Sequence, residues 1–324
     1  MRALVTGGAG YVGSIVAAQL LDAGHEVVVL DDLSRGHAAA LPPGARHVAV
    51  SLNDADALRG PLADGFDAVL HFAALSLVAE SVEHPERYWA NNVGGTRNLL
   101  DAMRERGVRR LVFSSTAATY GEPDTVPIRE DEPPAPVNAY GASKLAVDLM
   151  IRDECRAHGL AAASLRYFNV AGASRGLGED HDPETHLIPL VLQAASGARD
   201  HIKVFGTDYP TRDGTAVRDY IHIEDLGRAH LLALERLEPG THQVLNLGTG
   251  DGSTVREVIE AARRVTGQEI PARDEGRRPG DPPQLVASNE RAWDVLGWTP
   301  ERSLEDMIRD AWEWHRAHPG GYGD

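Results

Sequence analysis

Two residues whose side chains could do acid–base chemistry stand four positions apart near the middle of the chain. Tyr140 and Lys144 belong to the run Asn138-Ala-Tyr-Gly-Ala-Ser-Lys144. Positions i and i+4 share one face of an α-helix, so the Lys144 ammonium is expected beside the Tyr140 phenol. A free tyrosine has a pKa of about 10, and a neighbouring cation lowers that pKa because it favours the phenolate. The pair therefore predicts a general base for an alcohol or sugar hydroxyl. In isolation, the same spacing more often marks a solvated helix face.

A glycine-rich turn near the N-terminus predicts a dinucleotide site. The run Gly7-Gly-Ala-Gly10-Tyr-Val-Gly13 follows an apolar strand pattern and precedes an amphipathic helix pattern. Such glycines allow a tight turn and bring backbone N–H groups close to a pyrophosphate at the helix N-terminus. Asp31 and Asp32 end the next strand pattern, at about the 20-residue spacing at which a carboxylate binds the ribose hydroxyls. A carboxylate there repels a 2′-phosphate, so we expect NAD rather than NADP.

Hydroxyl side chains end a third strand pattern ahead of the tyrosine. Ser114-Ser-Thr116 follows the apolar run Arg110–Phe113 and precedes Tyr140. A Ser/Thr cluster after a strand is usually only a turn, but here it completes a set of hydroxyl, phenol and ammonium groups. Ala117-Ala118-Thr119 follows directly, without a carboxylate. Elimination of water across two sugar carbons needs a further acid and base, so dehydration is disfavoured.

Composition limits the classes of partner that the chain is expected to bind. The chain has 324 residues and a formal net charge of −16, which disfavours nucleic acid and anionic membranes as general partners. An anionic substrate would then need a local group of arginines. Cys155 is the single cysteine, so no disulfide forms within the chain. The histidines are scattered, and we expect no metal. We find no signal-peptide pattern and no apolar run of membrane-spanning length, so we expect a cytoplasmic enzyme.

Alternating strand and helix patterns in the first half predict an α/β fold with a doubly wound parallel (Rossmann) sheet. The strand patterns are Ala3–Thr6, Glu26–Leu30, His47–Val50, Ala68–Phe72, Arg110–Ser114 and Ala162–Tyr167, and the helical patterns are Tyr11–Ala23, Tyr88–Arg106 and Tyr140–His158. The second half has more Pro and Gly, with strand signals at Ile202–Phe205 and Val244–Leu247 and helical patterns at Leu187–Ser196, Ile223–Glu235, Thr254–Val265 and Leu304–Ala317. We expect an NAD-binding domain at 1–168 with a return segment near 219–250. Residues 169–324 would mainly form a smaller mixed α/β domain that binds substrate.

Taken together, these motifs resemble the extended short-chain dehydrogenase/reductases, and more narrowly the UDP-glucose 4-epimerases. The resemblance also includes His71-Phe-Ala-Ala74, Asn91-Asn-Val-Gly94, Arg166-Tyr-Phe-Asn169, Asp208-Tyr-Pro, Asp213-Gly-Thr, Val217-Arg-Asp-Tyr-Ile-His222 and Trp312-Glu-Trp314. It covers essentially the whole chain. It implies tightly held NAD, a UDP-hexose substrate and a homodimer.

The resemblance also implies the binding residues. Those expected to contact NAD are Gly7, Gly10, Tyr11, Val12, Gly13, Asp31, Asp32, Ser51, Leu52, Phe72, Ala73, Ala74, Asn92, Ser114, Tyr140, Lys144 and Tyr167. Those expected to contact the UDP-sugar are Thr116, Tyr140, Phe168, Asn169, His186, Leu187, Ile202, Lys203, Phe205, Arg218, Tyr220, Arg278 and Asp281. Tyr140, Lys144 and Thr116 are the expected catalytic residues.

Within the substrate set, the resemblance gives several residues distinct roles. Arg218, Arg278 and Asn169 would bind the diphosphate, and arginine's planar fork suits phosphate oxygens. Asp281 would accept from the uridine ribose and Phe205 would flank uracil. Without the resemblance, each arginine would be assigned to a surface salt bridge and Phe205 to the core. His186 would then cap the helix that starts near Leu187.

Two positions depart from the family pattern, and the substrate stays open. Ser51 stands where an aspartate usually contacts adenine, and neither Leu75 nor Ser76 is the usual lysine. We therefore expect weaker cofactor retention or altered substrate contact.

The implied reaction interconverts UDP-galactose and UDP-glucose by transient oxidation at sugar C4. The alternatives are the same chemistry on UDP-N-acetylhexosamines or UDP-pentoses, another sugar-nucleotide oxidoreductase of this class, a net alcohol dehydrogenase, and a catalytically silent NAD sensor. Leu285, expected at the sugar pocket, has an intermediate size that does not discriminate among them.

Overall fold

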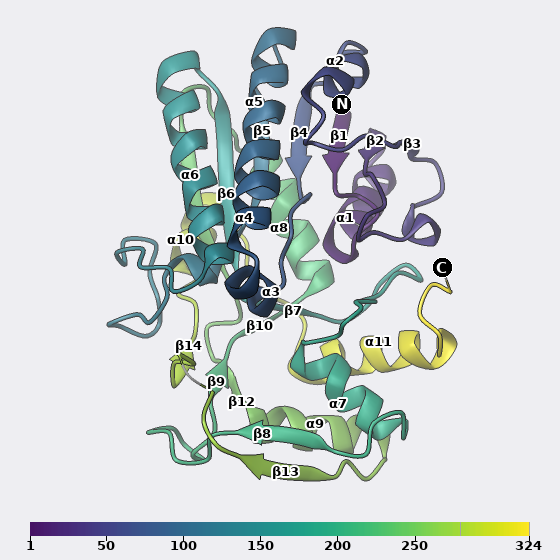
Figure 1. Cartoon of the computed structure of the whole chain (residues 1–324), viewed down its shortest axis with the longest axis vertical. Helices are drawn as coiled ribbons and strands as arrows, with labels where there is room; N and C mark the ends of the chain where they lie inside the picture. The colour runs from purple at the N-terminus through teal and green to yellow at the C-terminus, as the bar shows by residue number, and fades with distance from the viewer. Residues whose placement is uncertain (279, 324) are drawn as a thin grey trace.

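A seven-stranded parallel sheet forms the larger, upper part of the molecule, and a smaller part lies below the carboxyl ends of its strands (Figure 1). The computed structural model describes residues 1–278 and 280–323. The strand order is β11-β6-β5-β4-β1-β2-β3. These strands are β1 (Arg2–Thr6), β2 (Glu26–Leu30), β3 (Arg46–Val48), β4 (Ala68–His71), β5 (Arg110–Thr116), β6 (Ala161–Tyr167) and β11 (His242–Leu247). The predicted α/β fold with a doubly wound sheet is confirmed.

Side chains that alternate along the strands fill two cores, one on each face of the sheet. Ala3 and Val5 of β1 join the core under α1 (Tyr11–Asp22), α8 (Ile223–Glu235) and α10 (Glu290–Leu296). Leu4 belongs to the opposite core, under α2 (Ala55–Leu62), α5 (Gly95–Arg106) and α6 (Ala139–His158). The strand order reverses between β1 and β4, and such a reversal opens a ligand crevice at the carboxyl ends of the strands.

One predicted helix is divided in the structure. The pattern Tyr88–Arg106 comprises the end of α4 (Pro85–Tyr88), a π-helical segment η2 (Trp89–Gly94) and α5, and α3 (Val78–Glu83) precedes them. Within η2, the Asn92 side chain accepts a hydrogen bond from Leu75 N at 2.8 Å and donates to Ser143 Oγ at 3.0 Å. These bonds tie the π-helical turn to α6 and to the loop after β4. Single-turn π segments of this kind often occur at functional sites.

The lower part is built from short elements around a third core. Its helices are α7 (Leu187–Ala195), α9 (Val255–Thr266) and α11 (Leu304–Ala317), and its strands are β7 (Asn169–Ala171), β8 (Ile202–Phe205), β9 (Val217–Arg218), β10 (Tyr220–His222), β12 (Ser253–Thr254), β13 (Ala272–Glu275) and β14 (Gln284–Leu285). Elsewhere among the described residues lie the 3-10 turns η1 (Ala38–Ala40) and η3 (Ala117–Thr119). Most of the strands in the lower part were not expected, because two or three residues carry no readable periodicity. In the part of the chain that the structure describes, no helix has the length and apolarity needed to cross a membrane.

Candidate active site

Three predicted catalytic residues meet at the carboxyl end of β5. Asn138 caps α6 by accepting a hydrogen bond from Gly141 N at 2.9 Å, which starts the helix just before Tyr140. Lys144, one turn later, is buried and its Nζ donates to the Ser114 carbonyl oxygen at 2.8 Å. The Thr116 side chain lies beside the Tyr140 phenol and acts to lower its pKa. Thr116, Tyr140 and Lys144 therefore lie about the carboxyl end of β5, and their catalytic roles stay a prediction.

Burial controls the charges of this group. Burial lowers the pKa of Lys144 to about 7, although Asp148 opposes the shift. Burial also raises the pKa of Tyr140, against the hydrogen bond from Thr116. The net shift in the pKa of this phenol is therefore upward, and not downward as expected, because desolvation is the larger effect. The ammonium bonds the Ser114 carbonyl and lies 4.8 Å from the centre of the Phe113 ring.

A buried ion pair behind Lys144 was not anticipated from the sequence. Arg166 donates to Asp148 Oδ2 from Nη2 at 2.8 Å and from Nε at 3.1 Å, and Ser115 Oγ donates to the same oxygen at 3.2 Å. The second carboxylate oxygen, Oδ1, is buried and has no hydrogen-bond partner. Asp148 stands one helical turn beyond Lys144, so it supplies negative charge on the lysine's inner side. The sequence signal was Tyr140, Lys144 and Asp148 at successive i+4 positions.

The glycine turn and Asp31 fit a dinucleotide. Gly10 caps α1 with no side-chain hydrogen bond, and the first helical turn holds no acidic residue, so the N-terminus is suited to an anion. A Cβ on Gly13 would collide with the Gly7 carbonyl oxygen, and Gly7 itself has a φ of 73°, so glycine is required at both positions. The Asp31 carboxylate accepts from Ala9 N and Leu33 N at 2.9 Å each, which fixes it at the carboxyl end of β2.

The two aspartates after β2 titrate differently. Burial raises the pKa of Asp31 despite those backbone hydrogen bonds. Burial acts the same way on Asp32, but hydrogen bonds from Ser34 and Ser51 outweigh it and lower that pKa. Ser51 therefore lies against Asp32, within the region expected to hold the adenosine.

The other residues expected to bind NAD lie along the same edge of the sheet or support it. Phe72 N and Ala73 N both donate to Thr6 O, at 2.9 and 3.1 Å, which joins the ends of β1 and β4. Ser114 and Tyr167 share a hydroxyl–hydroxyl hydrogen bond. Tyr11 donates to Gly172 O at 2.6 Å. Leu52 is buried in the core against α5, while Val12 and Ala74 are partly buried. Asn92 braces the loop after β4 through its bond from Leu75 N.

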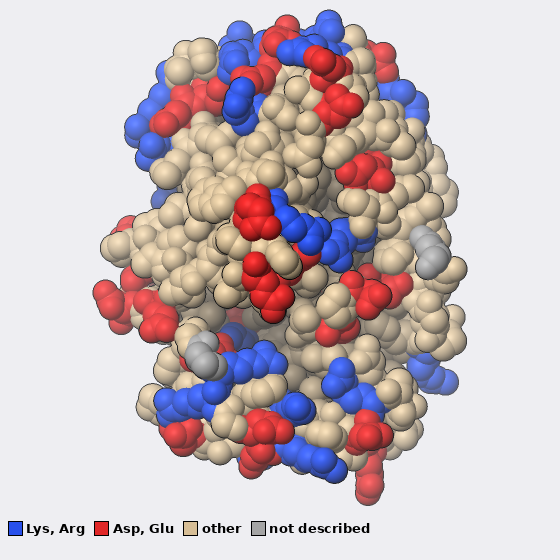
Figure 2. All heavy atoms as spheres, in the orientation of Figure 1, with Lys and Arg blue, Asp and Glu red and all other residues tan. Residues whose placement is uncertain are grey.

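A cavity with two arginines and two carboxylates in its lining, here called the basic cavity for its arginines, lies beside Arg278. Arg218 forms an ion pair with Asp281, and the Arg278 guanidinium lies 3.9 Å above the centre of the Phe205 ring. The cavity has a volume of about 390 Å³ and is lined by Glu122, Tyr209, Arg277, Arg278, Gly280, Asp281, Pro282 and Pro283. Figure 2 shows Lys and Arg side chains bordering a hollow on this face. Arg278 and Asp281 thus line one cavity, with Phe205 under Arg278 and Arg218 paired to Asp281, and their binding roles stay a prediction.

The remaining substrate candidates are more dispersed. Asn169 donates through Nδ2 to Asp219 O at 2.8 Å, and Phe168 packs with Leu285 against a small cluster beside η3. Ile202, Tyr220 and Leu187 belong to or pack on the third core. The Lys203 side chain pairs with Glu275, with its Nζ 3.9 Å from the carboxylate.

Asp219 organises the loops around Arg218 and was missed in the sequence. Its carboxylate accepts from Thr249 N at 2.7 Å, Thr249 Oγ1 at 2.6 Å, and Gly250 N and Ala287 N at 3.0 Å each. Burial raises the pKa of Asp219, and these hydrogen bonds oppose the shift. The Arg-Asp-Tyr motif thus places an arginine against Asp281, which lines the cavity, and next to it a buried aspartate that holds the loops.

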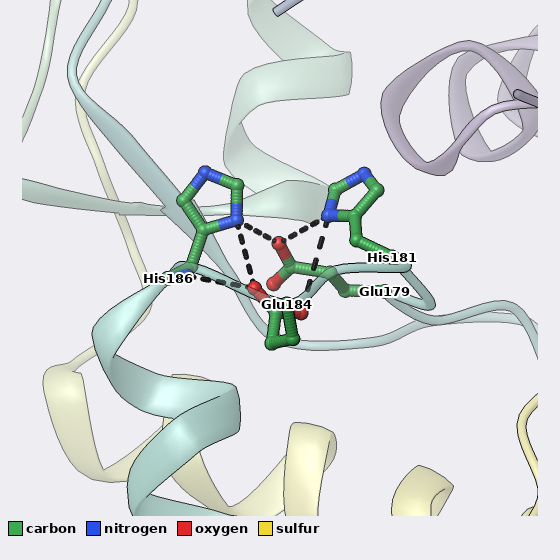
Figure 3. Close-up of side chains that lie close together, drawn as sticks. All are labelled: Glu179, His181, Glu184 and His186. Atoms are coloured by element: carbon green, nitrogen blue, oxygen red, sulfur yellow. Dashed lines mark hydrogen bonds and ion pairs between the residues drawn. The ribbon is translucent and has the colours of Figure 1, made fainter. Parts of the chain in front are cut away.

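His186 lies in a cluster of four polar side chains rather than alone (Figure 3). Its Nδ1 is 2.6 Å from Glu179 Oε1 and 3.3 Å from Glu184 Oε1, and His181 Nδ1 is 3.1 Å from the same Glu179 oxygen. Burial lowers the pKa of His186, but the two carboxylates outweigh it and raise that pKa to about 10. The cluster was not expected, although the pattern Glu179-x-His181-x-x-Glu184-x-His186 carries its signal.

Residues 3–248 match the NAD dependent epimerase/dehydratase family. The chain belongs to this family. It is 59% identical to the UDP-glucose 4-epimerase of Streptomyces lividans, over 99% of this chain and 98% of that protein. The resemblance to the UDP-glucose 4-epimerases is confirmed, and NAD is the cofactor of the NAD dependent epimerase/dehydratase family.

Solved structures of the family superpose over nearly the whole chain. A UDP-glucose 4-epimerase crystal structure matches with a TM-score of 0.96 and 47% identity, covering 99% of both chains. A UDP-glucose-4-epimerase from Stenotrophomonas maltophila, with bound NAD and formylated UDP-arabinopyranose, matches with a TM-score of 0.95 and 39% identity over 98% of this chain and 99% of that one.

Proposed function

We propose that the chain interconverts UDP-galactose and UDP-glucose by transient oxidation at sugar C4. The observation that carries this proposal is the convergence of Tyr140, Lys144 and Thr116 at the carboxyl end of β5. Beyond Thr116 the chain forms η3, whose residues Ala117–Thr119 provide no carboxylate. The site thus has a base for one hydroxyl and lacks the acid–base pair that dehydration needs there. Membership of the epimerase family agrees with this chemistry.

Tyr140 is assigned as the base. As a phenolate it takes the proton of the 4-hydroxyl when the C4 hydride leaves, and it returns that proton when hydride comes back to the other face. NAD, when bound, supplies the hydride acceptor and donor, so the net redox change is zero. Thr116, beside the phenol, orients the hydroxyl. Lys144, its charge favoured by Asp148, stabilises the phenolate.

The cofactor and the UDP group are assigned to opposite sides of this base. We place the pyrophosphate at the Gly7–Gly13 turn and the adenosine ribose at Asp31 and Asp32. Arg218 and Arg278 would hold the diphosphate of the UDP-sugar. Binding energy is then concentrated away from the reacting ring, which leaves the 4-keto sugar free to turn. On this proposal residues 1–168 with the segment near 219–250 carry NAD, and residues 169–324 mainly carry the UDP-sugar.

A UDP-pentose is the second candidate substrate. It is favoured by the Stenotrophomonas relative, whose structure contains formylated UDP-arabinopyranose. In this chain Leu285 and Phe168 pack beside η3, next to Thr116, where the sugar would lie. Comparing kcat/KM for UDP-galactose, UDP-N-acetylgalactosamine and UDP-arabinopyranose tests the order of preference. The proposal requires UDP-galactose to be the best substrate of the three.

The reaction itself is tested by incubating purified protein with UDP-galactose without added NAD. Formation of UDP-glucose is expected, and stoichiometric NADH accumulation would indicate a net dehydrogenase instead. Tyr140→Phe should keep its NAD and lose about 10²–10⁴-fold in kcat, the usual contribution of a positioned base. Tyr88→Phe is the matched control, because Tyr88 packs edge-on against Tyr140 with ring centres 6.5 Å apart. Unchanged turnover in Tyr140→Phe would reject the assigned base.

A homodimer is part of the proposal. Large apolar side chains are exposed on α3 (Val78 and Val82), on η2 (Trp89) and on α6 (Leu149), and these elements pack on one another. A second copy of the chain would cover them. Trp89→Glu should shift the mass measured by light scattering from dimer to monomer. Trp293→Glu, at an exposed tryptophan on α10, should leave the dimer intact.

We also assign the enzyme to the cytoplasm. Its single cysteine, Cys155, is buried in the core, so its fold does not depend on an oxidising compartment.

A further inference from the structure

The loop that leads into α7 gathers four potential metal ligands. Glu179, His181, Glu184 and His186 each offer one atom, and these atoms all lie within 4.8 Å of one another. Figure 3 shows both imidazole rings pointing their Nδ1 atoms at one oxygen of Glu179, with the Glu184 carboxylate beside them. Two histidines and two carboxylates in convergence form a donor set typical of a divalent first-row transition metal.

The spacing of the donor atoms suits such an ion. A tetrahedral Zn²⁺ with bonds of about 2.1 Å keeps its ligand atoms about 3.4 Å apart. In this cluster, Nδ1 of His186 is 2.6 Å from the Glu179 carboxylate and 3.3 Å from that of Glu184. Nδ1 of His181 lies 3.1 and 4.0 Å from the same two groups. Small side-chain rotations would therefore open the cluster around one ion.

The charges of the two glutamates give a second, independent reason to expect a bound cation in this cluster. The Glu179 and Glu184 side chains are only 6% and 8% exposed. Among the described residues, every ion pair of these two carboxylates is to His181 or His186, and none is to a Lys or Arg. Two buried negative charges without a permanent cation need protonated imidazoles or a bound cation. The His186 side chain is 46% exposed, which leaves a route for an ion from solvent.

We propose that Glu179, His181, Glu184 and His186 bind one divalent transition-metal ion of the Zn²⁺ class. The ion takes no part in hydride or proton transfer. It ties the loop to the residues just before α7, where Glu184 Oε1 already accepts from Thr185 N and from the N-cap His186 N at 2.6 and 2.7 Å. Because imidazole binds metal as the neutral ring, each histidine that is protonated releases its proton on binding.

The site would brace a junction of three segments. Asp180, inside the same loop, accepts a hydrogen bond from Tyr322 N at 2.8 Å near the end of the chain. The carboxylates of Glu179 and Glu184 also act electrostatically on Tyr11, in the glycine turn, whose pKa burial raises well above its usual value. His315 of α11 faces the same two carboxylates, and burial lowers its pKa. Metal binding is therefore expected to stabilise the whole chain, and not only the loop.

The test is Zn²⁺ binding by chelator-treated, full-length protein, followed by calorimetry and thermal unfolding. Wild type should bind one equivalent and unfold at a higher temperature with the metal. His181→Gln and Glu184→Gln should each weaken binding by at least about 10–100-fold, the loss typical of even outer-shell changes. Both should also lose the temperature shift. His158→Gln, which removes an exposed histidine at the end of α6, should bind as wild type does.

Two results would overturn the metal site. One is wild-type protein that takes up less than a stoichiometric amount of Zn²⁺, with no change in unfolding temperature. The other is equal binding by His181→Gln, Glu184→Gln and His158→Gln, since Zn²⁺ would then sit on scattered surface groups. Neither measurement uses sugar turnover, so its failure is distinguishable from failure of the proposed reaction. Calorimetry in buffers of different ionisation enthalpy measures the protons released, and wild type should release more than Glu184→Gln at equal occupancy.

Discussion

The charge of Lys144 depends on Asp148, a residue with no assigned contact to NAD or to the sugar. A buried ammonium is costly, and burial lowers the pKa of Lys144 to about 7. Asp148 raises that pKa again, and Arg166 holds the Asp148 carboxylate in place. The charge on the catalytic lysine at neutral pH is therefore set by a buried carboxylate one helical turn further along α6. Asp148 is a positioning residue, because it acts on the reaction only through Lys144.

The pH profile of Asp148→Asn should reveal this dependence. Removing the carboxylate lowers the pKa of Lys144 further, so the lysine loses its proton at a lower pH. If the charged lysine supports Tyr140, kcat/KM should begin to fall at a lower pH in Asp148→Asn than in wild type. Above that pH, kcat/KM of the variant should be about tenfold lower than that of wild type for each pH unit by which the fall has moved. Asp153→Asn, at an exposed aspartate of α6, should keep the wild-type profile. A profile that Asp148→Asn leaves unmoved, in protein shown to be folded, would contradict the assignment.

Arg278 should matter chiefly for substrate binding. Its guanidinium is placed on Phe205 beside the basic cavity, and a charge-assisted hydrogen bond contributes about 1.5–3 kcal/mol. Arg278→Met should therefore raise KM for UDP-galactose about 10–100-fold and change kcat much less. Arg273→Met, on the exposed strand β13, is the matched control. A fall in kcat at constant KM would place Arg278 in the chemical step instead.

At the scale of elements, local signals predicted the parts of the site that local sequence builds. The glycine turn, α1, α6 and the carboxyl end of β5 were placed correctly, because glycine requirements, a cap at Asn138 and helical periodicity are all local. The π-helical turn η2 was not foreseen, since it depends on contacts of Asn92 with Leu75 and Ser143. The strands β9, β12 and β14 are two residues each and exist only as partners of one another.

The glycine turn gives a prediction at this scale. A Cβ at Gly13 would collide with the Gly7 carbonyl, and the backbone there has to shift to relieve it. Gly13→Ala should therefore release NAD during purification, measured as nucleotide freed from acid-precipitated protein. Gly60→Ala is the matched change in α2, where a Cβ has no heavy atom within 4 Å. That variant should keep its NAD and gain up to about 1 kcal/mol in stability. Equal NAD content in both variants would contradict the role of the turn.

For the whole molecule, the sequence gives the charged groups but not how burial changes their pKa values. The net charge of −16 predicted a local group of arginines for an anionic substrate; Arg278 lines the cavity, and Arg218 pairs with Asp281, which also lines it. The raised pKa of Tyr140 was predicted with the wrong sign, because desolvation comes from segments far apart in the chain. The cluster of Glu179 and His186 was missed for a related reason, because side chains that converge in a loop leave no regular spacing in the sequence.

Buried neutral histidines should make the fold sensitive to acid. His230 of α8 is fully buried, its Nδ1 bonds Leu226 O at 2.8 Å, and burial lowers its pKa to about 4. An unfolded histidine has a pKa of about 6.5, so between those values the unfolded state binds more protons and stability falls as pH falls. At pH 5 this difference costs about 2 kcal/mol. Between pH 8 and 5, the free energy of unfolding of His230→Leu, measured by urea unfolding, should therefore fall by about 2 kcal/mol less than that of wild type. The control His158→Gln, at an exposed histidine, should lose as much free energy of unfolding as wild type. Parallel losses in all three proteins would mean that His230 does not contribute to acid unfolding.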